Sequence, residues 1–237
     1  MIYVFGLSNF ARQFSQNFIE DHRYRYILRG LGNTLLISIL AAMMGLALGF
    51  LIAIVRSAHD KTGKLKILNV LCKVYITIIR GTPVMVQLMI MYYVVFTSPT
   101  TSKIFVAVMA FGFNSAAYVA EIVRSGIMSI DAGQFEAGRS LGFNFFQTMC
   151  YIILPQAFKT VVPSLANEFI AVIKETSICG TITLTDLTRG GDIIRSITFD
   201  AFMPLLMVAA IYLVIVMVLT AGTNRLERRL RRNEKSL

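Results

Sequence analysis

Long apolar runs bounded by charges constrain this chain more than any other feature of its sequence. Residues 30–55, 104–120 and 202–222 contain no charged side chain, and the first run ends at Arg56. A helix of about 20 apolar residues crosses the hydrocarbon core of a bilayer. Only 15% of the 237 residues are charged, against about a quarter in soluble domains. We therefore expect an all-α, polytopic transmembrane helical bundle.

The runs predict five membrane spans. The first covers 30–55, the third 104–123 and the fifth 202–222. A second apolar region, 67–96, is broken by the sequence RGTP at 80–83, where glycine and proline end or kink a helix. Its span is expected mainly within 84–96. The fourth span is expected to begin near Pro163 and to continue to about residue 180.

The spans divide the chain into an N-terminal segment, 1–30, a transmembrane domain, 31–222, and a basic tail, 223–237. In the first segment, Phe10, Phe14 and Phe18 recur at helical spacing between polar residues. This pattern is typical of an amphipathic helix lying at a membrane surface. We therefore expect the first segment to be interfacial and extracytoplasmic.

Charge sets the expected orientation, because basic residues accumulate on the cytoplasmic side of a membrane. The tail carries a dense, nearly unopposed basic cluster: Arg225, Arg228, Arg229, Arg231, Arg232 and Lys235. With five spans, residues 56–66 and 124–159 are then cytoplasmic and the N-terminus lies outside. Basic residues near the N-terminus oppose this assignment, partly offset by two acidic ones: Arg12, Arg23, Arg25, Arg29, Glu20 and Asp21. The net charge of +10 is interpreted as topological rather than as a sign of nucleic-acid binding.

Motifs for catalysis, metal binding or cofactor binding are missing from the sequence. The three cysteines are scattered and the two histidines are isolated, so neither a disulfide framework nor a metal site is indicated. No phosphate loop, HExxH zinc motif or GxSxG nucleophile elbow occurs. We expect no catalytic residue and no cofactor on this chain.

Polar side chains inside the spans are the remaining candidates, since such groups usually face a cavity or a partner helix. Asn114, Tyr118 and Glu121 share one face of the third span, and Asn167 lies on a polar face of the fourth. These four residues are the predicted substrate path, with Glu121 favouring cationic substrates. Polar contacts that only hold the bundle together are an equal alternative. Arg124, within one turn of Glu121, is expected to pair with it.

A second candidate is the polar stretch at 131–159, which interrupts the apolar chain. A short amphipathic helix is expected at 135–141, ending at Gly142 as a C-terminal cap. Phe143, Phe145 and Phe146 follow and form an apolar surface. Such a surface marks contact with lipid headgroups or docking into a groove on a cytoplasmic partner.

The sequence GQFEAGRSLGFNFFQTMCYIILPQA resembles the EAA loop of permease subunits of bacterial ABC importers. The matching residues are Glu136, Ala137, Gly142, Ile152, Leu154 and Pro155. Gly138 replaces the usual second alanine, a change expected to loosen the short helix by about 1 kcal/mol. The stretches GLGNTLLIS, RGTPVMVQL, SAAYVAEIVRSGI and KETS narrow the resemblance to the polar amino acid (histidine/glutamine/arginine) type, from Gly30 to Leu219.

The resemblance implies a permease in a bacterial inner membrane that dimerises with itself or a similar subunit. A separate ATPase dimer, which binds ATP and Mg²⁺, would dock on a coupling helix that includes Glu136, Ala137, Gly138, Leu141 and Gly142. An extracytoplasmic binding protein would deliver a polar amino acid. The chain itself would not be an enzyme.

Two alternatives remain at this stage. An ion-driven secondary transporter would need no ATPase and predicts inverted internal repeats, which the sequence does not display. A membrane anchor without transport predicts spans that lack aligned polar faces.

Overall fold

The computed structural model describes residues 7–232, and every regular element in this range is a helix. The long helices are α2 (Tyr24–Thr62), α3 (Lys66–Gly81), α5 (Lys103–Met128), α8 (Leu154–Glu175) and α10 (Phe202–Arg232). The short ones are α1 (Leu7–Phe14), α4 (Val84–Ile90), α6 (Ala132–Ser140), α7 (Phe145–Thr148) and α9 (Leu187–Thr198). Among the described residues, four helices are long and apolar enough to cross a membrane, or five if the bent pair α3–α4 counts as one span. The expectation of an all-α bundle of about five spans is confirmed.

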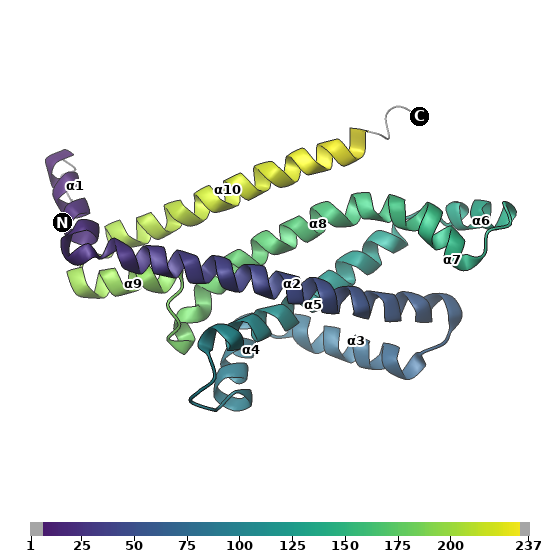
Figure 1. Cartoon of the computed structure of the whole chain (residues 1–237), viewed down its shortest axis with the longest axis horizontal. Helices are drawn as coiled ribbons and strands as arrows, with labels where there is room; N and C mark the ends of the chain where they lie inside the picture. Colours follow the sequence, from purple (N-terminus) through teal and green to yellow (C-terminus); the bar gives the residue numbers. More distant parts are fainter. Residues whose placement is uncertain (1–6, 233–237) are drawn as a thin grey trace.

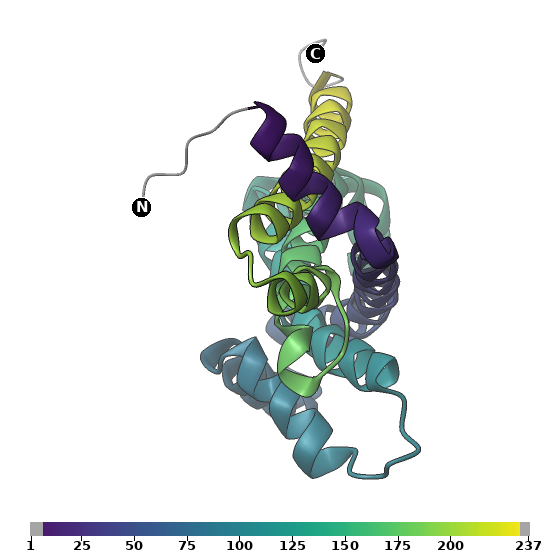
Figure 2. The same ribbon diagram turned by 90° about the vertical axis from the view of Figure 1, so that its left-hand side faces the viewer.

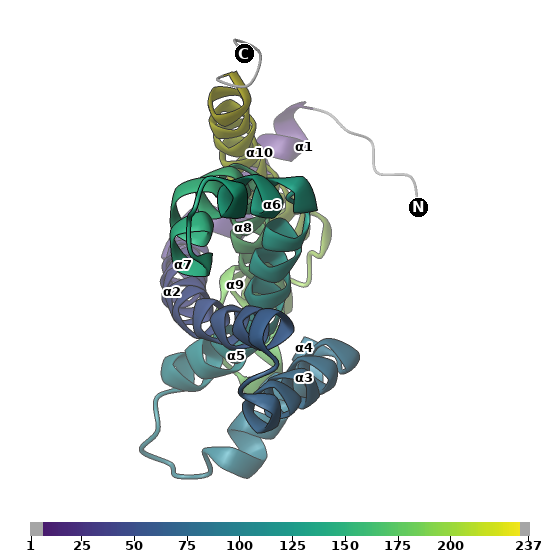
Figure 3. The same ribbon diagram turned by 90° about the vertical axis from the view of Figure 1, so that its right-hand side faces the viewer.

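The long helices run alongside one another, and the short helices other than α4 lie at the two ends (Figure 1). α1 and α9 lie at one end of the bundle, and α6 and α7 lie at the other. Seen along the bundle, α10 and the α3–α4 pair lie on opposite sides of α2, α5 and α8 (Figures 2 and 3). Any path that follows the bundle therefore connects the α9 end with the α6 end.

The centre of the bundle is the contact between α2 and α5, the most extensive helix pair in the structure. A side chain on Gly49 would come 2.5 Å from Val119 Cγ1, and one on Gly45 would come 2.8 Å from Ser115 Oγ. The small residues therefore allow α2 and α5 to approach each other closely. Phe111 on α5 is fully buried in the adjoining apolar cluster.

The second apolar region breaks where the RGTP sequence predicts, and α3 and α4 meet at an angle of 107°. Thr82 and Pro83 adopt extended backbone conformations at the break, as expected of a residue before proline and of proline at a helix start. The expected position of the span was wrong, because α3 is the longer arm, with 16 residues. Lys66, Lys73 and Arg80 lower the average hydropathy of α3 in the sequence. The apolar face that this helix exposes was therefore not recognised as part of a span.

The predicted start of the fourth span at Pro163 was also wrong. α8 begins at Leu154, and Pro163 lies buried inside it. The helical run extends without interruption from Phe145 to Ile182. Proline is tolerated within membrane helices because neighbouring groups satisfy the backbone around it.

The expected segment boundaries fall inside continuous helices. α2 begins at Tyr24 and runs through residue 30, and α10 runs through residue 222 to Arg232. Leucine, glutamate and arginine dominate the end of α10 and are good helix formers, so the helix continues beyond the apolar run. Lys235 of the predicted basic tail lies outside the described residues.

The N-terminal segment packs on the protein as well as facing outward. Phe10 is 48% exposed, whereas Phe18 is buried beside Ile27, Leu187 and Ile194. The aromatic spacing therefore supplies a protein contact at Phe18 in addition to the exposed face at Phe10.

Candidate transport cavity and coupling helix

Glu121 is the centre of a charged cluster that joins three helices. Its carboxylate forms an ion pair with Arg56 of α2, whose side chain is 9% exposed. The other carboxylate oxygen lies 3.8 Å from Nη1 of Arg80, at the end of α3. The Arg80 guanidinium also lies over the ring of Tyr118, 5.2 Å from its centroid. One carboxylate on α5 thus faces two guanidinium groups.

The expected local pair between Glu121 and Arg124 is wrong. Arg124 Nε instead lies 3.2 Å from Oδ2 of Asp60 on α2. Arg56 and Arg80 reach Glu121 from neighbouring helices, so tertiary contacts replace the pair that spacing along one helix suggested.

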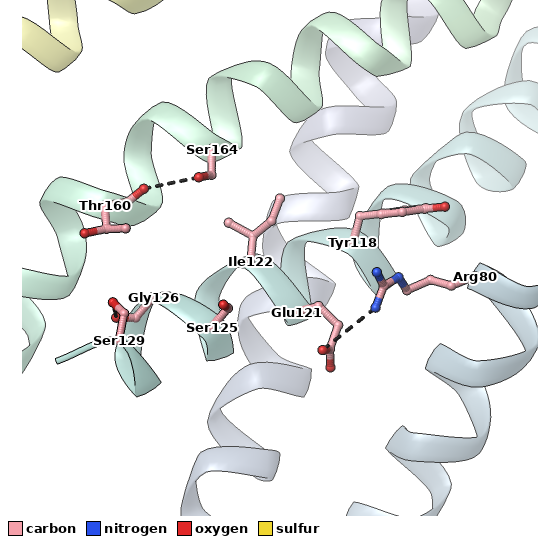
Figure 4. Close-up of a pocket in the computed structure, with 9 residues that line it drawn as sticks. All are labelled: Arg80, Tyr118, Glu121, Ile122, Ser125, Gly126, Ser129, Thr160 and Ser164. Atoms are coloured by element: carbon pink, nitrogen blue, oxygen red, sulfur yellow. Dashed lines mark hydrogen bonds and ion pairs between the residues drawn. The ribbon is translucent and has the colours of Figure 1, made fainter. Parts of the chain in front are cut away.

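A cavity of about 360 Å³ opens beside the charged cluster. Figure 4 shows Arg80 pointing toward Glu121 from one side and hydroxyl-bearing residues of α5 and α8 lying on the other. The cavity is lined by Arg80, Tyr118, Glu121, Ile122, Ser125, Gly126, Ser129, Thr160 and Ser164. Its volume lies within the range of about 300–1,000 Å³ that is usual for small-molecule sites.

Two of the four predicted path residues, Tyr118 and Glu121, line this cavity, and the other two lie elsewhere. Asn114 is buried and its Nδ2 donates a hydrogen bond to Gln87 Oε1 at 3.0 Å. Gln87 in turn donates to the carbonyl oxygen of Ile79 at 2.7 Å, across the α3–α4 break. Asn114 therefore helps to hold the bend. Asn167 is exposed on α8 and is not among the residues that line the cavity.

Sequence reasoning missed Arg56, which was interpreted only as the end of the first apolar run, and Arg80, which was interpreted only as part of the RGTP break. It also missed Glu168 as a site residue. Ser115 Oγ donates to Glu168 Oε1 at 2.9 Å, and both residues line a second, mainly apolar cavity of about 250 Å³ between α2, α5 and α8. The signal was present, because an acidic residue inside a membrane span marks a functional site by default.

The predicted coupling segment forms α6 and the turn that follows it. The helix starts at Ala132, earlier than expected, because the Asp131 carboxylate accepts a hydrogen bond from Gly133 N at 2.6 Å and caps its N-terminus. It ends at Ser140, and Gly142 follows with a φ of +82°, which confirms the expected glycine stop. A reciprocal capping box between Asn144 and Gln147 then starts α7.

The predicted coupling residues differ in exposure. Glu136, Ala137 and Gly142 are exposed, and Leu141 is 72% exposed. Phe146, just beyond them, is 73% exposed and adds a second large apolar side chain to this end of the molecule. Gly138 is buried against α7. The segment thus presents an apolar surface on one face and packs on the protein with the other.

The opposite end is tied together by Asp186, which is fully buried and caps α9. Its carboxylate accepts hydrogen bonds from the backbone N–H groups of Thr188 at 2.9 Å and Arg189 at 3.3 Å. Burial nevertheless dominates and raises the pKa of this carboxyl to about 6. In the same cap, the N–H of Leu187 donates to Thr34 Oγ1 at 3.1 Å, which fastens α9 to α2.

Asp192, on the exposed side of α9, shows the opposite effect. Its hydrogen bond with Arg195, at 2.6 Å, and the nearby charge of Arg189 lower the pKa of its carboxyl. Within residues 7–232 no group of three or more histidine, cysteine, aspartate or glutamate side chains is placed to hold a metal ion.

Most of the chain is similar to known proteins. Residues 45–232 match a family described as binding-protein-dependent transport system inner membrane component. The glutamine transport system permease protein GlnP of Escherichia coli is 37% identical over 208 residues, which cover 86% of this chain and 93% of the relative. The arginine transport system permease protein ArtQ of Bacillus subtilis is 36% identical, with 88% and 94% covered. A solved amino acid ABC transporter with histidines superposes with a TM-score of 0.82 at 36% identity, covering 96% of this chain and all of the other.

Proposed function

This chain belongs to the family of binding-protein-dependent transport system inner membrane components, and we propose that it forms the membrane pathway of an ATP-driven importer for a polar amino acid. The observation that carries the proposal is its similarity to glutamine and arginine permeases over nearly the full length of both chains. The chain is a multi-pass membrane permease of the ABC type, and its helical bundle is that of the amino acid transporter it superposes on.

The ATPase is a separate subunit that binds to α6. A nucleotide-binding partner would contact an exposed surface at this end of the molecule, formed by Glu136, Ala137, Leu141 and Phe146. Contact with a partner groove would bury these two apolar side chains, which water disfavours. In this arrangement the α6 end and the C-terminus of α10 are cytoplasmic, and ATP and Mg²⁺ stay on the partner.

The α9 end then faces outward and receives the amino acid from a binding protein. A second permease subunit, identical or similar, completes the pathway. Tyr118 and Glu121 belong to the path within this subunit, and Asn114 supports it by holding α4. Asn167, which is exposed on α8, would line a path wall shared with the second subunit. Rigid-body movement of helices around a central site would carry the substrate across.

Uptake into proteoliposomes tests the proposal. The permease is reconstituted with its partner ATPase and binding protein, and uptake of radiolabelled glutamine, arginine and histidine is measured with and without enclosed ATP. We expect accumulation of at least one amino acid that requires both ATP and the binding protein. Uptake driven by an ion gradient without ATP would instead identify a secondary transporter. No uptake of any amino acid under either condition would refute the proposed function.

A further inference from the structure

The charged cluster of Arg56, Arg80 and Glu121 beside the cavity carries a net positive charge. Arg56 is almost fully buried and satisfies one oxygen of the carboxylate, while Arg80 approaches the other only to 3.8 Å. Of the described residues that line the cavity, Arg80 and Glu121 are the charged ones. Asp60 is engaged by Arg124. With Arg56 included, two positive charges face one negative charge.

Arg80 has donors available for an additional partner. Its side chain is 43% exposed and lines the cavity. The Tyr118 ring supports the guanidinium at 5.2 Å, a cation–π contact that orients the group without using its N–H donors. Among the described residues, no hydrogen-bond acceptor lies within bonding distance of the Arg80 guanidinium. A guanidinium offers a planar fork of donors that matches a carboxylate.

The opposite wall of the cavity suits a positive group. Ser129 Oγ donates to the carbonyl oxygen of Gly126 at 2.8 Å, and Ser164 Oγ donates to that of Thr160 at 3.2 Å. Because these hydroxyl protons are used, the remaining lone pairs of both oxygens can accept a hydrogen bond. The cavity thus offers donors at one side and acceptors at the other, as a zwitterion requires.

We infer that Arg80 binds the α-carboxylate of the transported amino acid and that the hydroxyl oxygens of Ser129 and Ser164 accept hydrogen bonds from its α-ammonium group. This inference rests on the proposed function and deepens it. These contacts involve the α-carboxylate and α-ammonium groups, which all amino acids share. Glu121 then orients Arg56 and Arg80 and does not select cationic substrate side chains. An arginine within a membrane span is costly, which agrees with a binding role.

Ligand-induced thermal stabilisation of the permease–ATPase complex, in detergent and without the binding protein, tests the inference. The probe is the amino acid identified by the uptake assay, compared with the same molecule lacking the α-carboxylate: agmatine for arginine, histamine for histidine or 4-aminobutanamide for glutamine. The variants are Arg80→Gln and Arg80→Lys. Arg124→Gln is the matched control, since Arg124 is a cation one turn from Glu121 on α5 that does not line the cavity.

We expect the amino acid to stabilise the wild-type complex and the carboxylate-free analogue to have no effect. Arg80→Gln should weaken binding roughly tenfold or more, as loss of a charged hydrogen bond does. Arg80→Lys should retain part of the affinity, and Arg124→Gln should bind as the wild type does. Unchanged binding by Arg80→Gln, equal binding of the analogue, or no binding to a wild-type complex that transports would each overturn the inference and leave the proposed function intact. A wild-type complex that transports no amino acid refutes the function itself.

Discussion

Gly138 of α6 and Thr148 of α7 lie so close that a methyl group on residue 138 would come 2.7 Å from Thr148 Cγ2. The Thr148 side chain cannot turn away without cost, because its hydroxyl donates to the carbonyl oxygen of Asn144 at 3.0 Å. The glycine that weakens α6 as an isolated helix is therefore what allows it to pack. The expected loosening of the coupling helix is offset by this contact.

Gly138→Ala should accordingly destabilise the permease rather than stabilise it. Alanine gains about 1 kcal/mol of helix propensity, but overpacking costs roughly 1–3 kcal/mol. The measurement is the thermal unfolding midpoint of the purified permease, with substrate-stimulated ATPase activity of the complex. Combining Gly138→Ala with Thr148→Ala should restore stability. Gly32→Ala is the control, because nothing lies within 4 Å of a side chain there; a higher midpoint for Gly138→Ala than for Gly32→Ala would contradict the packing argument.

Gly142→Val should reduce coupling between ATP hydrolysis and uptake. Its φ of +82° is strained for a β-branched residue although no atom lies within 4 Å of the new side chain. The turn between α6 and α7 would shift, and with it the surface offered to the ATPase. We expect a loss of uptake per ATP hydrolysed while the protein still inserts, and Gly142→Asn should be milder because asparagine tolerates this conformation.

Gly63→Val tests whether backbone strain alone reduces coupling, because Gly63 lies outside the segment proposed to contact the ATPase. Gly63 has a φ of +67°, also without neighbours, and lies in the turn between α2 and α3. We expect this variant to lower stability but to keep the ratio of uptake to hydrolysis. An equal loss of coupling in both variants would show that backbone strain alone is responsible.

Glu121→Gln should destabilise the bundle without changing the preference between cationic and neutral amino acids. Removing the carboxylate leaves the buried Arg56 without its partner, which costs about 3 kcal/mol. Replacing both, as Arg56→Gln with Glu121→Gln, should recover part of this loss. Thermal unfolding and competition between labelled arginine and glutamine uptake are the measurements. A changed preference between arginine and glutamine in Glu121→Gln would instead support a role for Glu121 in selecting cationic substrates.

Asp186 should make stability depend on pH. Its pKa is raised from 3.8 to about 6 in the fold, so the folded state holds the proton more tightly than the unfolded state. The stabilising contribution is therefore complete below about pH 4 and is lost as pH rises through 6, a change on the order of 3 kcal/mol. Unfolding midpoints of the detergent-solubilised permease between pH 4 and 7.5 measure it.

Asp186→Asn keeps a side chain that caps α9 but removes the titration. Its unfolding midpoint should vary less between pH 4 and 7.5 than that of the wild type. Asp192→Asn is the control, since the lowered pKa of Asp192 places its own contribution above pH 3.8, lost only as pH falls further. A pH profile that is the same for wild type and Asp186→Asn would exclude this carboxyl as the cause.

Local patterns succeeded where a single helix or turn decides the outcome. The glycine stop at 142 and the break at 80–83 each depend on a few consecutive residues. Predictions failed where a helix end is decided by its neighbours. Pro163 lies inside α8, where neighbouring helices can support the backbone. α3 is a long helix, although its charged residues obscure the apolar pattern in the sequence.

The sequence by itself determined the class of molecule: apolar runs of membrane length, a polar interruption at 131–159, and motifs that identify a permease family. Only the tertiary structure decided which charges meet. Arg56, Arg80 and Glu121 lie far apart along the chain and on three different helices, and nothing local to any of them specifies the others. Their contact follows from the packing of both α2 and α3 against α5, which depends on the arrangement of the whole bundle.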